Sequence, residues 1–233
     1  MMHSLLSIAM IICFTGCSTI DGSGLRTGSE IQATDISFDA MTGEVKYTLS
    51  EPALVRIRIG IKDGGPLLTH LLDWEYRGKG EHKEIWDGKI QGSEIDFRGR
   101  GDLMVVFRAV PEHEKKNNPE LIKKAPRLTV NFLESKGSDE NGLPIISGRV
   151  PLRTTINSKD DAWLSNTRYE TSIFIDHVFL TEEEEGTNPF TYYLDTEKFS
   201  NGVHTVTVTV TSYGGTAGSQ SAMVMIKNGA THE

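Results

Sequence analysis

From residue 204 to residue 211 the sequence HTVTVTVT alternates between threonine and a valine or histidine. Successive side chains of a β-strand point to opposite faces of the sheet, so a period of two predicts a strand. We expect Val206, Val208 and Val210 to face a core and the threonines to face water. His204 continues the valine side, so we expect a hydrogen-bonded core residue rather than a ligand.

Short runs of alternating apolar and polar residues, separated by Gly- and Asn-rich turns, recur after residue 30, whereas helical periodicity is scarce. This pattern predicts an all-β fold, with two tandem immunoglobulin-like antiparallel β-sandwiches. In one expected strand, 54–61, the isoleucines should face the core while Arg56 and Arg58 face water. The expected strands are 31–38, 44–49, 54–61, 67–72, 82–86, 103–110, 128–133, 145–156, 171–179, 190–194, 203–212 and 221–227.

The segment PEHEKKNNPELIKKAP at 111–126 interrupts this pattern with charged residues and three prolines. Such composition is typical of a connector between domains. With 233 residues the chain is long enough for two domains with their own cores. We therefore expect a first sandwich at 31–110, a linker at 111–126 and a second sandwich at 127–229.

Both cysteines of the chain, Cys13 and Cys17, lie at the end of an apolar N-terminal stretch. About ten apolar residues are too few to span a membrane but suit the hydrophobic region of a signal peptide. The cysteines could form a metal or redox pair, a disulfide, or a lipid-attachment site. A metal pair requires further ligands, and no His or third Cys lies close by in the sequence. The context favours lipid attachment.

The four residues Phe14-Thr15-Gly16-Cys17 resemble the lipobox of bacterial lipoproteins. The resemblance implies that residues 1–16 are a signal peptide and that Cys17 becomes the acylated N-terminus. Residues 17–30, rich in Gly, Ser and Thr, would then be a flexible tether. Ser18 stands where Asp would favour the inner membrane, so the resemblance implies an outer membrane lipoprotein, facing the periplasm or the medium.

Two further segments resemble known families. Residues 44–110, with GEHKEIWDG at 80–88, resemble the immunoglobulin-like domain of flagellar hook-capping proteins, in which the Trp packs inside the sandwich. Residues 145–228, with SIFIDHVFL and NGVHTVTVTV, resemble bacterial immunoglobulin-like domains attached to surface proteins and polysaccharide-degrading enzymes. Such modules act as spacers, adhesive units or ligand-binding platforms, and the fold alone does not choose among these roles.

The formal net charge of −8 argues against nucleic acid as a partner, because phosphate binding needs clustered Lys and Arg. The sequence also contains no G-x-S-x-G, H-E-x-x-H or Walker-type motif. We therefore expect no enzymatic activity and no cofactor.

Three acidic runs are candidate calcium ligands: Glu182–Glu185, Asp160-Asp161 and the run at 139–142. Calcium takes several carboxylate and carbonyl oxygens from flexible loops. None of the runs has the spacing of a known calcium loop, so we expect solvated loops and no metal site.

Two pairs of aromatic residues are candidate ligand-binding residues. Trp163 and Tyr169 lie in an expected loop between strands, where flat rings could stack on a sugar. Alternatively, Trp163 folds back onto the sandwich as a hydrophobic plug. Trp74 and Tyr76, on an expected loop at 73–79, form a second such pair.

These features together predict a non-catalytic, membrane-anchored adhesive or scaffolding module that holds an envelope or extracellular partner protein. A sandwich can recruit such a partner by strand addition at a sheet edge. The alternatives are a glycan-binding surface module that uses the loop aromatics to bind polysaccharide, and a hydrolase whose site matches no motif.

Overall fold

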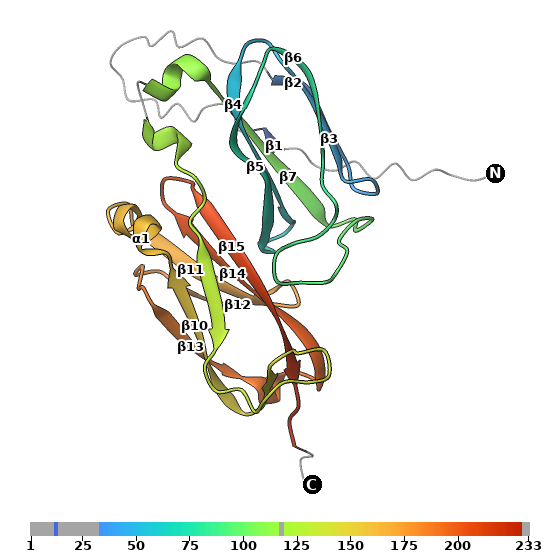
Figure 1. The fold of residues 1–233 in the computed structure, drawn as a ribbon, viewed down its shortest axis with the longest axis vertical. Helices are drawn as coiled ribbons and strands as arrows, with labels where there is room; N and C mark the ends of the chain where they lie inside the picture. The colour runs from blue at the N-terminus through green and yellow to red at the C-terminus, as the bar shows by residue number, and fades with distance from the viewer. Residues whose placement is uncertain (1–11, 14–32, 117–118, 230–233) are drawn as a thin grey trace, which may run out of the picture. The chain divides into compact units, whose positions relative to one another are not determined.

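The computed structural model describes residues 12–13, 33–116 and 119–229 (Figure 1). Cys17, the tether at 17–30 and most of the expected signal peptide lie outside the described residues. The chain forms two compact units. Among the described residues, unit 1 comprises 12–13, 33–62, 70–88, 96–116 and 119–124, and unit 2 comprises 63–69, 89–95 and 125–229.

The chain is all-β, built mainly from antiparallel strand pairs in immunoglobulin-like sandwiches, as the alternating pattern predicted. Unit 1 contains a three-stranded sheet in the order β2-β3-β6 and a four-stranded sheet in the order β1-β7-β4-β5. The strands are β1 (Ile12–Cys13), β2 (Ala33–Asp39), β3 (Glu44–Leu49), β4 (Ala53–Ile61), β5 (Leu67–Arg77), β6 (Gly80–Ile85) and β7 (Leu103–Pro111). The first three residues of β5 are assigned to unit 2 and the rest of the strand to unit 1.

The core of unit 1 is formed by alternate residues of its strands. Ile57 and Ile59 of β4 are fully buried, which confirms their expected direction. Trp86 is buried beside Phe97, with ring centroids 6.4 Å apart, so this Trp does pack inside the sandwich. The expectation that Arg56 faces water is wrong, because only 2% of this residue is exposed.

The segment after β7 is held on unit 1. It contains two short 3-10 helices, η1 (Glu112–Lys116) and η2 (Pro119–Ile122). Ile122 packs against a buried cluster of Leu54, Trp74 and Val110. Lys124 also forms an ion pair with Glu75 at 3.2 Å. These contacts fix the last part of the expected linker to one unit.

Unit 2 contains two sheets, in the orders β13-β10-β8 and β12-β11-β14-β15-β9. Its elements are β8 (Leu128–Phe132), β9 (Ile145–Ile146), β10 (Arg149–Ile156), α1 (Ser158–Leu164), β11 (Tyr169–Ile175), β12 (Val178–Glu183), β13 (Phe190–Asp195), η3 (Thr196–Lys198), β14 (Gly202–Ser212) and β15 (Ala217–Ile226).

The core of unit 2 lies between the inner faces of these sheets. Val206 and Val208 of β14 are fully buried among residues such as Leu152, Ile173 and Leu194, which confirms the predicted direction of the valines. A core assembled from alternate residues of two facing sheets is the usual core of a sandwich.

The prediction that the threonines of β14 face water is wrong. Thr207 is fully buried, and its hydroxyl lies 2.8 Å from the hydroxyl of Ser221 on β15. Residues 63–69 and 89–95 belong to unit 2 and pack on β15, where Ser219 Oγ donates to the carbonyl of Leu68 at 3.3 Å. Alternation separates the two faces of a strand but does not reveal that both faces are covered.

Candidate binding surface

The predicted loop aromatics of unit 2 do not form an exposed pair. Asn157 caps α1 by accepting from the backbone N–H of Lys159 at 3.1 Å, and the helix carries Trp163. Trp163 is half-buried against a cluster that contains Leu164 and Tyr169. Trp163 therefore contributes to packing, as in the alternative of a hydrophobic plug.

Tyr169 is only 1% exposed, so the prediction that its ring stacks on a ligand is wrong. Burial raises the pKa of the Tyr169 hydroxyl to about 12, and the negative charges of Asp161 and Glu183 act in the same direction. This hydroxyl has no hydrogen-bond partner among the residues that the structure describes. Tyr169 is a core residue.

The second predicted pair is also separated. β5 continues to Arg77, so the expected loop at 73–79 is largely strand. Trp74 is buried and adopts a φ of 59°, whereas Tyr76 is exposed. The prediction for Trp74 is therefore wrong, and Tyr76 alone does not form an aromatic patch.

Trp74 instead packs on a buried arginine. The Arg56 guanidinium carbon lies 4.5 Å from the centre of the Trp74 ring, and Arg56 Nε donates to Asp73 Oδ1 at 2.8 Å. Arg56 and Trp74 also both donate to the backbone carbonyl of Lys123, Trp74 through Nε1 at 3.1 Å. One arginine thus joins β4, β5 and the segment after η2.

Three arginines gather around this site. Arg108 lies directly opposite Arg56 in the β4–β7 register, with its guanidinium carbon 5.6 Å from the Trp74 ring. Burial lowers the pKa of Arg56 to about 10, against the attraction of Asp73. We call Arg56, Arg58, Arg108, His70 and Asp73 the arginine cluster.

His70 is the neutral member of the arginine cluster. Its Nε2 is buried without a hydrogen-bond partner among the described residues. Burial lowers the pKa of His70 to about 4; the positive charges of Arg56 and Arg58 act in the same direction and Asp73 opposes them. The imidazole is therefore uncharged near neutral pH.

His204 is buried and fully hydrogen-bonded, as predicted. Its Nδ1 lies 2.6 Å from Asp176 Oδ2, and its Nε2 lies 2.8 Å from the carbonyl oxygen of Ser200. Asp176 Oδ1 also accepts from the backbone N–H of Thr205 at 2.9 Å. Because acceptors already face both ring nitrogens, this pair fixes the β11–β12 turn and offers no free base to a substrate.

The carboxylates of the acidic runs accept hydrogen bonds from nearby backbone N–H groups or pair with an arginine. Glu183 accepts hydrogen bonds at 3.0–3.1 Å from the N–H groups of Glu185, Gly186 and Thr187 and from the Thr187 hydroxyl. Asp160 pairs with Arg127 at 3.1 Å. In the described part of the chain no group of three or more His, Cys, Asp and Glu residues is arranged to hold a metal ion.

Replacing Glu183 by Ala is expected to lower the free energy of unfolding by about 1–3 kcal/mol, because the loop donors lose their acceptor. Millimolar Ca²⁺ is expected to leave the melting temperature unchanged. Glu184→Ala, at the exposed neighbouring position, is the control and should cost less than about 0.5 kcal/mol. A calcium-dependent rise in melting temperature that Glu183→Ala abolishes would instead indicate a calcium site.

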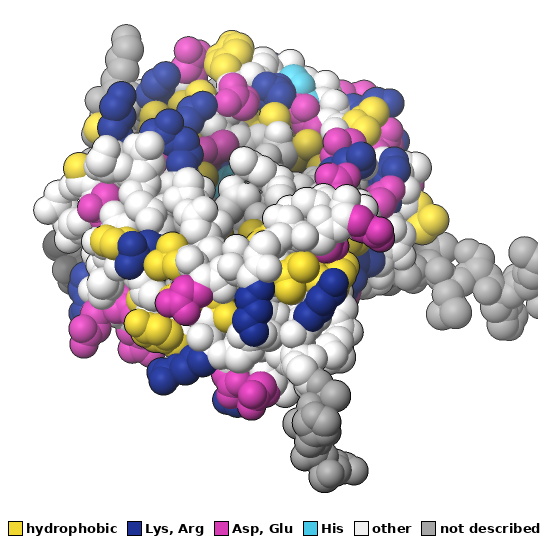
Figure 2. Space-filling model, turned by 60° about the horizontal axis from the view of Figure 1, so that its bottom comes forward, with side chains coloured by type: hydrophobic (Ala, Val, Ile, Leu, Met, Phe, Trp, Pro, Cys, Tyr) yellow, Lys and Arg dark blue, Asp and Glu magenta, His cyan; other side chains and the backbone are white. Residues whose placement is uncertain are grey.

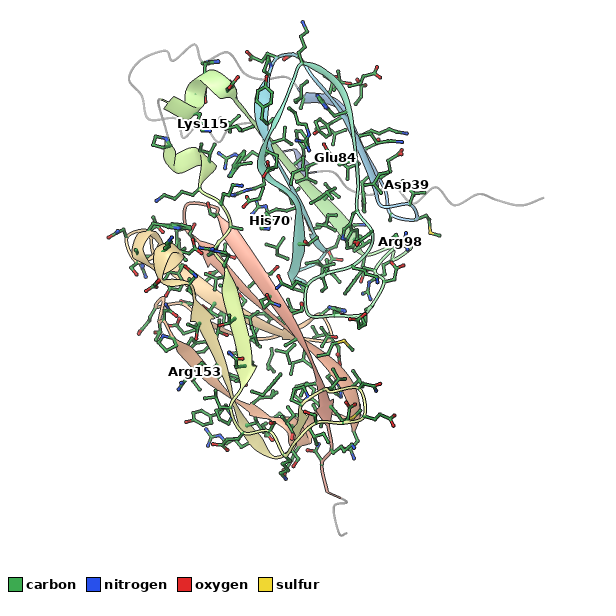
Figure 3. All side chains as sticks on the ribbon, in the orientation of Figure 1. Asp39, His70, Glu84, Arg98, Lys115 and Arg153 are labelled. Atoms are coloured by element: carbon green, nitrogen blue, oxygen red, sulfur yellow. The ribbon has the colours of Figure 1, made fainter. Side chains whose placement is uncertain are left out.

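Unit 2 does carry an exposed aromatic residue, on a sheet rather than a loop. The register of the sheet β13-β10-β8 places Thr191 on one side of Arg153 and Asn131 on the other. Tyr193 lies two residues further along β13 and is 54% exposed. Figure 3 shows Arg153 at the side of β10 and β13. We call this surface, formed by Asn131, Arg149, Arg153, Thr191 and Tyr193, the Tyr193 face.

The side chains of the Tyr193 face contact one another. The guanidinium carbon of Arg149 lies 4.9 Å from the centre of the Tyr193 ring, a cation–π distance. Arg153 Nε donates to the Thr191 hydroxyl at 3.3 Å. The alternating sequence of β10 could have indicated that Arg149 and Arg153 share a face, but their proximity to Tyr193 depends on the strand order.

The Tyr193 face carries two exposed arginine side chains in an acidic protein. Among the described residues neither Arg149 nor Arg153 forms an ion pair, although both are exposed. The carboxylate opposite Arg149 in the register, Asp195, lies 3.8 Å from Lys198. On the molecular face drawn in Figure 2, Lys and Arg side chains are interspersed with acidic and hydrophobic ones.

In the described residues, none of the helices has the length and apolar character needed to cross a membrane.

No protein-family model matches the chain, and no curated protein matches it. Among solved structures, an endo-β-1,4-mannanase from Thermotoga petrophila is 19% identical, with a TM-score of 0.33, over 44% of this chain and 20% of that one. Fibronectin(III)-like modules of Clostridium thermocellum CbhA are 12% identical, with a TM-score of 0.32, over 87% and 97%.

SGBP-B of the Bacteroides ovatus mixed-linkage glucan utilization locus, in complex with a mixed-linkage heptasaccharide, is 14% identical, with a TM-score of 0.30. The match covers 46% of this chain and 25% of that one. At this level of similarity the matches concern the fold class alone.

Proposed function

We propose that this chain is a non-catalytic binding module of the bacterial cell envelope, anchored through acylated Cys17, that holds a partner protein. The N-terminal sequence supports the anchor, because a short apolar stretch ends in Phe14-Thr15-Gly16-Cys17.

The observation that carries the proposal is the edge strand β12. It pairs with β11 and is the terminal strand of its sheet among the described strands. An edge strand presents backbone N–H and C=O groups that an extended partner segment can pair with. Val178 is 70% exposed and Phe179 is 49% exposed, so the edge also offers apolar contact area.

The charge on β12 indicates which segments it would accept. The strand ends in Glu182 and Glu183, and two further glutamates follow. Opposite charges on paired strands stabilise the pairing, and like charges destabilise it. The partner segment is therefore expected to combine apolar residues, facing Val178 and Phe179, with Lys or Arg facing the acidic end.

The test is crosslinking in intact cells followed by affinity capture of the full-length protein. The double variant Val178→Ser/Phe179→Ser is expected to lose a partner protein that the unaltered chain captures in near-equal amount. Tyr213→Ser is the matched control, because Tyr213 is exposed in the turn between β14 and β15, near the end of β11 opposite to the end that pairs with Val178. Capture of the same partner by the double variant would contradict the proposal.

The anchor is tested separately. Cys17→Ala is expected to move the protein from the membrane fraction to the soluble fraction of broken cells, because it removes the acylated residue. Retention of the variant in the membrane fraction would contradict lipidation of Cys17 but leave the role of β12 open.

A further inference from the structure

We propose that the Tyr193 face binds an acidic polysaccharide, a chain of sugars that carry carboxylate groups. This surface lies on the sheet β13-β10-β8, whereas β12 belongs to the other sheet of unit 2. The inference therefore adds a second binding activity and does not depend on the proposed protein partner.

The aromatic residue provides the sugar contact. Tyr193 is 54% exposed on a regular strand, and the cation–π contact with Arg149 at 4.9 Å restrains its ring. An aromatic ring is a flat apolar surface with low conformational entropy, suited to pack against the C–H groups of a sugar ring. Asn131 and Thr191, beside Arg153 in the register, offer amide and hydroxyl groups to sugar hydroxyls.

The two arginines determine the charge of the ligand. A guanidinium forms paired, charge-assisted hydrogen bonds with a carboxylate, and its planar fork matches carboxylate geometry. Arg149 and Arg153 are exposed, and neither forms an ion pair among the described residues. A neutral glycan would leave both cations unpaired, whereas carboxylates on a glycan would complement them.

The spacing of the arginines favours a polymer over a single sugar acid. Arg149 and Arg153 are four residues apart on β10, which at about 3.3 Å per residue places their Cα atoms ~13 Å apart. A single small carboxylate can reach one of them at a time. A chain of sugar acids laid along β10 reaches both and also covers Tyr193 on the neighbouring strand.

Two cations are too few for a nucleic-acid site of ordinary strength, which neutralises many phosphates. An acidic peptide would satisfy the arginines, but it lacks the rigid rings that a half-exposed Tyr193 can stack on. The combination of one aromatic ring, two unpaired guanidinium groups and neighbouring amide and hydroxyl groups therefore favours an acidic glycan.

The test measures binding of the purified full-length protein in detergent to three polymers by calorimetry and affinity electrophoresis. The probes are polygalacturonate, its methyl ester and polyglutamate. Esterification removes the negative charge and keeps the sugar chain, and polyglutamate keeps the charge without sugars. Polygalacturonate is expected to bind at least tenfold more tightly than either, with an affinity that falls as salt is added.

Variants locate the site. Arg149→Gln and Arg153→Gln are each expected to weaken binding of polygalacturonate roughly tenfold, the effect of losing charge-assisted hydrogen bonds. Tyr193→Ala is expected to weaken it by a similar factor. The matched control is the double variant Arg168→Gln/Tyr213→Ala, because the guanidinium carbon of Arg168 lies 5.5 Å from the centre of the Tyr213 ring elsewhere in unit 2. This double variant should bind polygalacturonate as tightly as the unaltered chain.

Each remaining outcome overturns the inference. Equal binding of the esterified polymer would indicate a neutral glycan site, and equal binding of polyglutamate would indicate a general anion surface. No binding of polygalacturonate, or binding that survives all three variants, would remove the Tyr193 face as a site. Val178→Ser/Phe179→Ser should retain polygalacturonate binding, which separates this test from that of the proposed partner protein.

Discussion

Replacing Arg56 by Met is expected to lower the free energy of unfolding of unit 1 by about 3–5 kcal/mol, the usual cost of removing one partner of a buried ion pair. The side chain is 2% exposed and pairs with Asp73 while stacking on Trp74 at 4.5 Å. Met fills much of the volume but leaves the Asp73 carboxylate without this cation and the Lys123 carbonyl without one of its donors. Urea unfolding followed by tryptophan fluorescence measures the loss.

A double variant distinguishes the ion pair from general disruption of packing. Arg56→Met/Asp73→Leu removes both charges and is expected to recover at least half of the loss, because replacing a buried pair by apolar residues is often neutral. Arg153→Met, at an exposed arginine of unit 2, should cost less than about 0.5 kcal/mol. A loss below 1 kcal/mol for Arg56→Met would show that the buried pair contributes little.

Arg56 also shows what the alternating pattern can and cannot predict. The pattern correctly assigned Ile57 and Ile59 to the core of unit 1 and placed Arg56 on the opposite face. It failed to predict that this face is covered by the segment ending at Lys123. The alternating pattern describes only the strand in which it occurs. The segment that covers the second face of β4 at Arg56 lies 67 residues further along the chain.

The same limit applies to β14. Val206 and Val208 are buried as predicted, yet Thr207, expected in water, is also fully buried. A threonine is tolerated there because its hydroxyl pairs with that of Ser221. A buried hydroxyl needs such a partner, and the partner stands on a neighbouring strand that the sequence of β14 does not specify.

Ligand-binding candidates were harder to predict than strands. The polar surroundings of Trp74 and Tyr169 in the sequence predicted exposed ligand contacts, but both residues are buried. Tyr193 stands inside a strand and is exposed. Its significance arises from Arg149, which lies 44 residues earlier and stacks on it only because β13 pairs with β10. A site assembled across strands requires the register, and period two does not provide it.

Acidification from pH 7 to pH 4 is expected to remove up to about 3 kcal/mol of unit 1 stability through His70. Burial lowers the pKa of His70 from 6.5 to about 4 in the folded chain. The unfolded chain therefore binds a proton more readily in this window, so the free energy of unfolding falls as the pH falls. The contribution is fully present above pH 6.5 and lost as the pH approaches 4.

The surroundings of His70 explain why protonation is costly. A charged imidazole would add a further positive charge beside Arg56 and Arg58, with Asp73 as the counter-charge. Chemical unfolding measured at half-unit steps between pH 7 and pH 4 tests this. His70→Gln is expected to flatten the pH dependence of the free energy of unfolding of unit 1. His113→Gln, at an exposed histidine, should leave that pH dependence unchanged. An unchanged slope in His70→Gln would assign the acid sensitivity to carboxylates, because their protonation also destabilises the folded state as the pH falls.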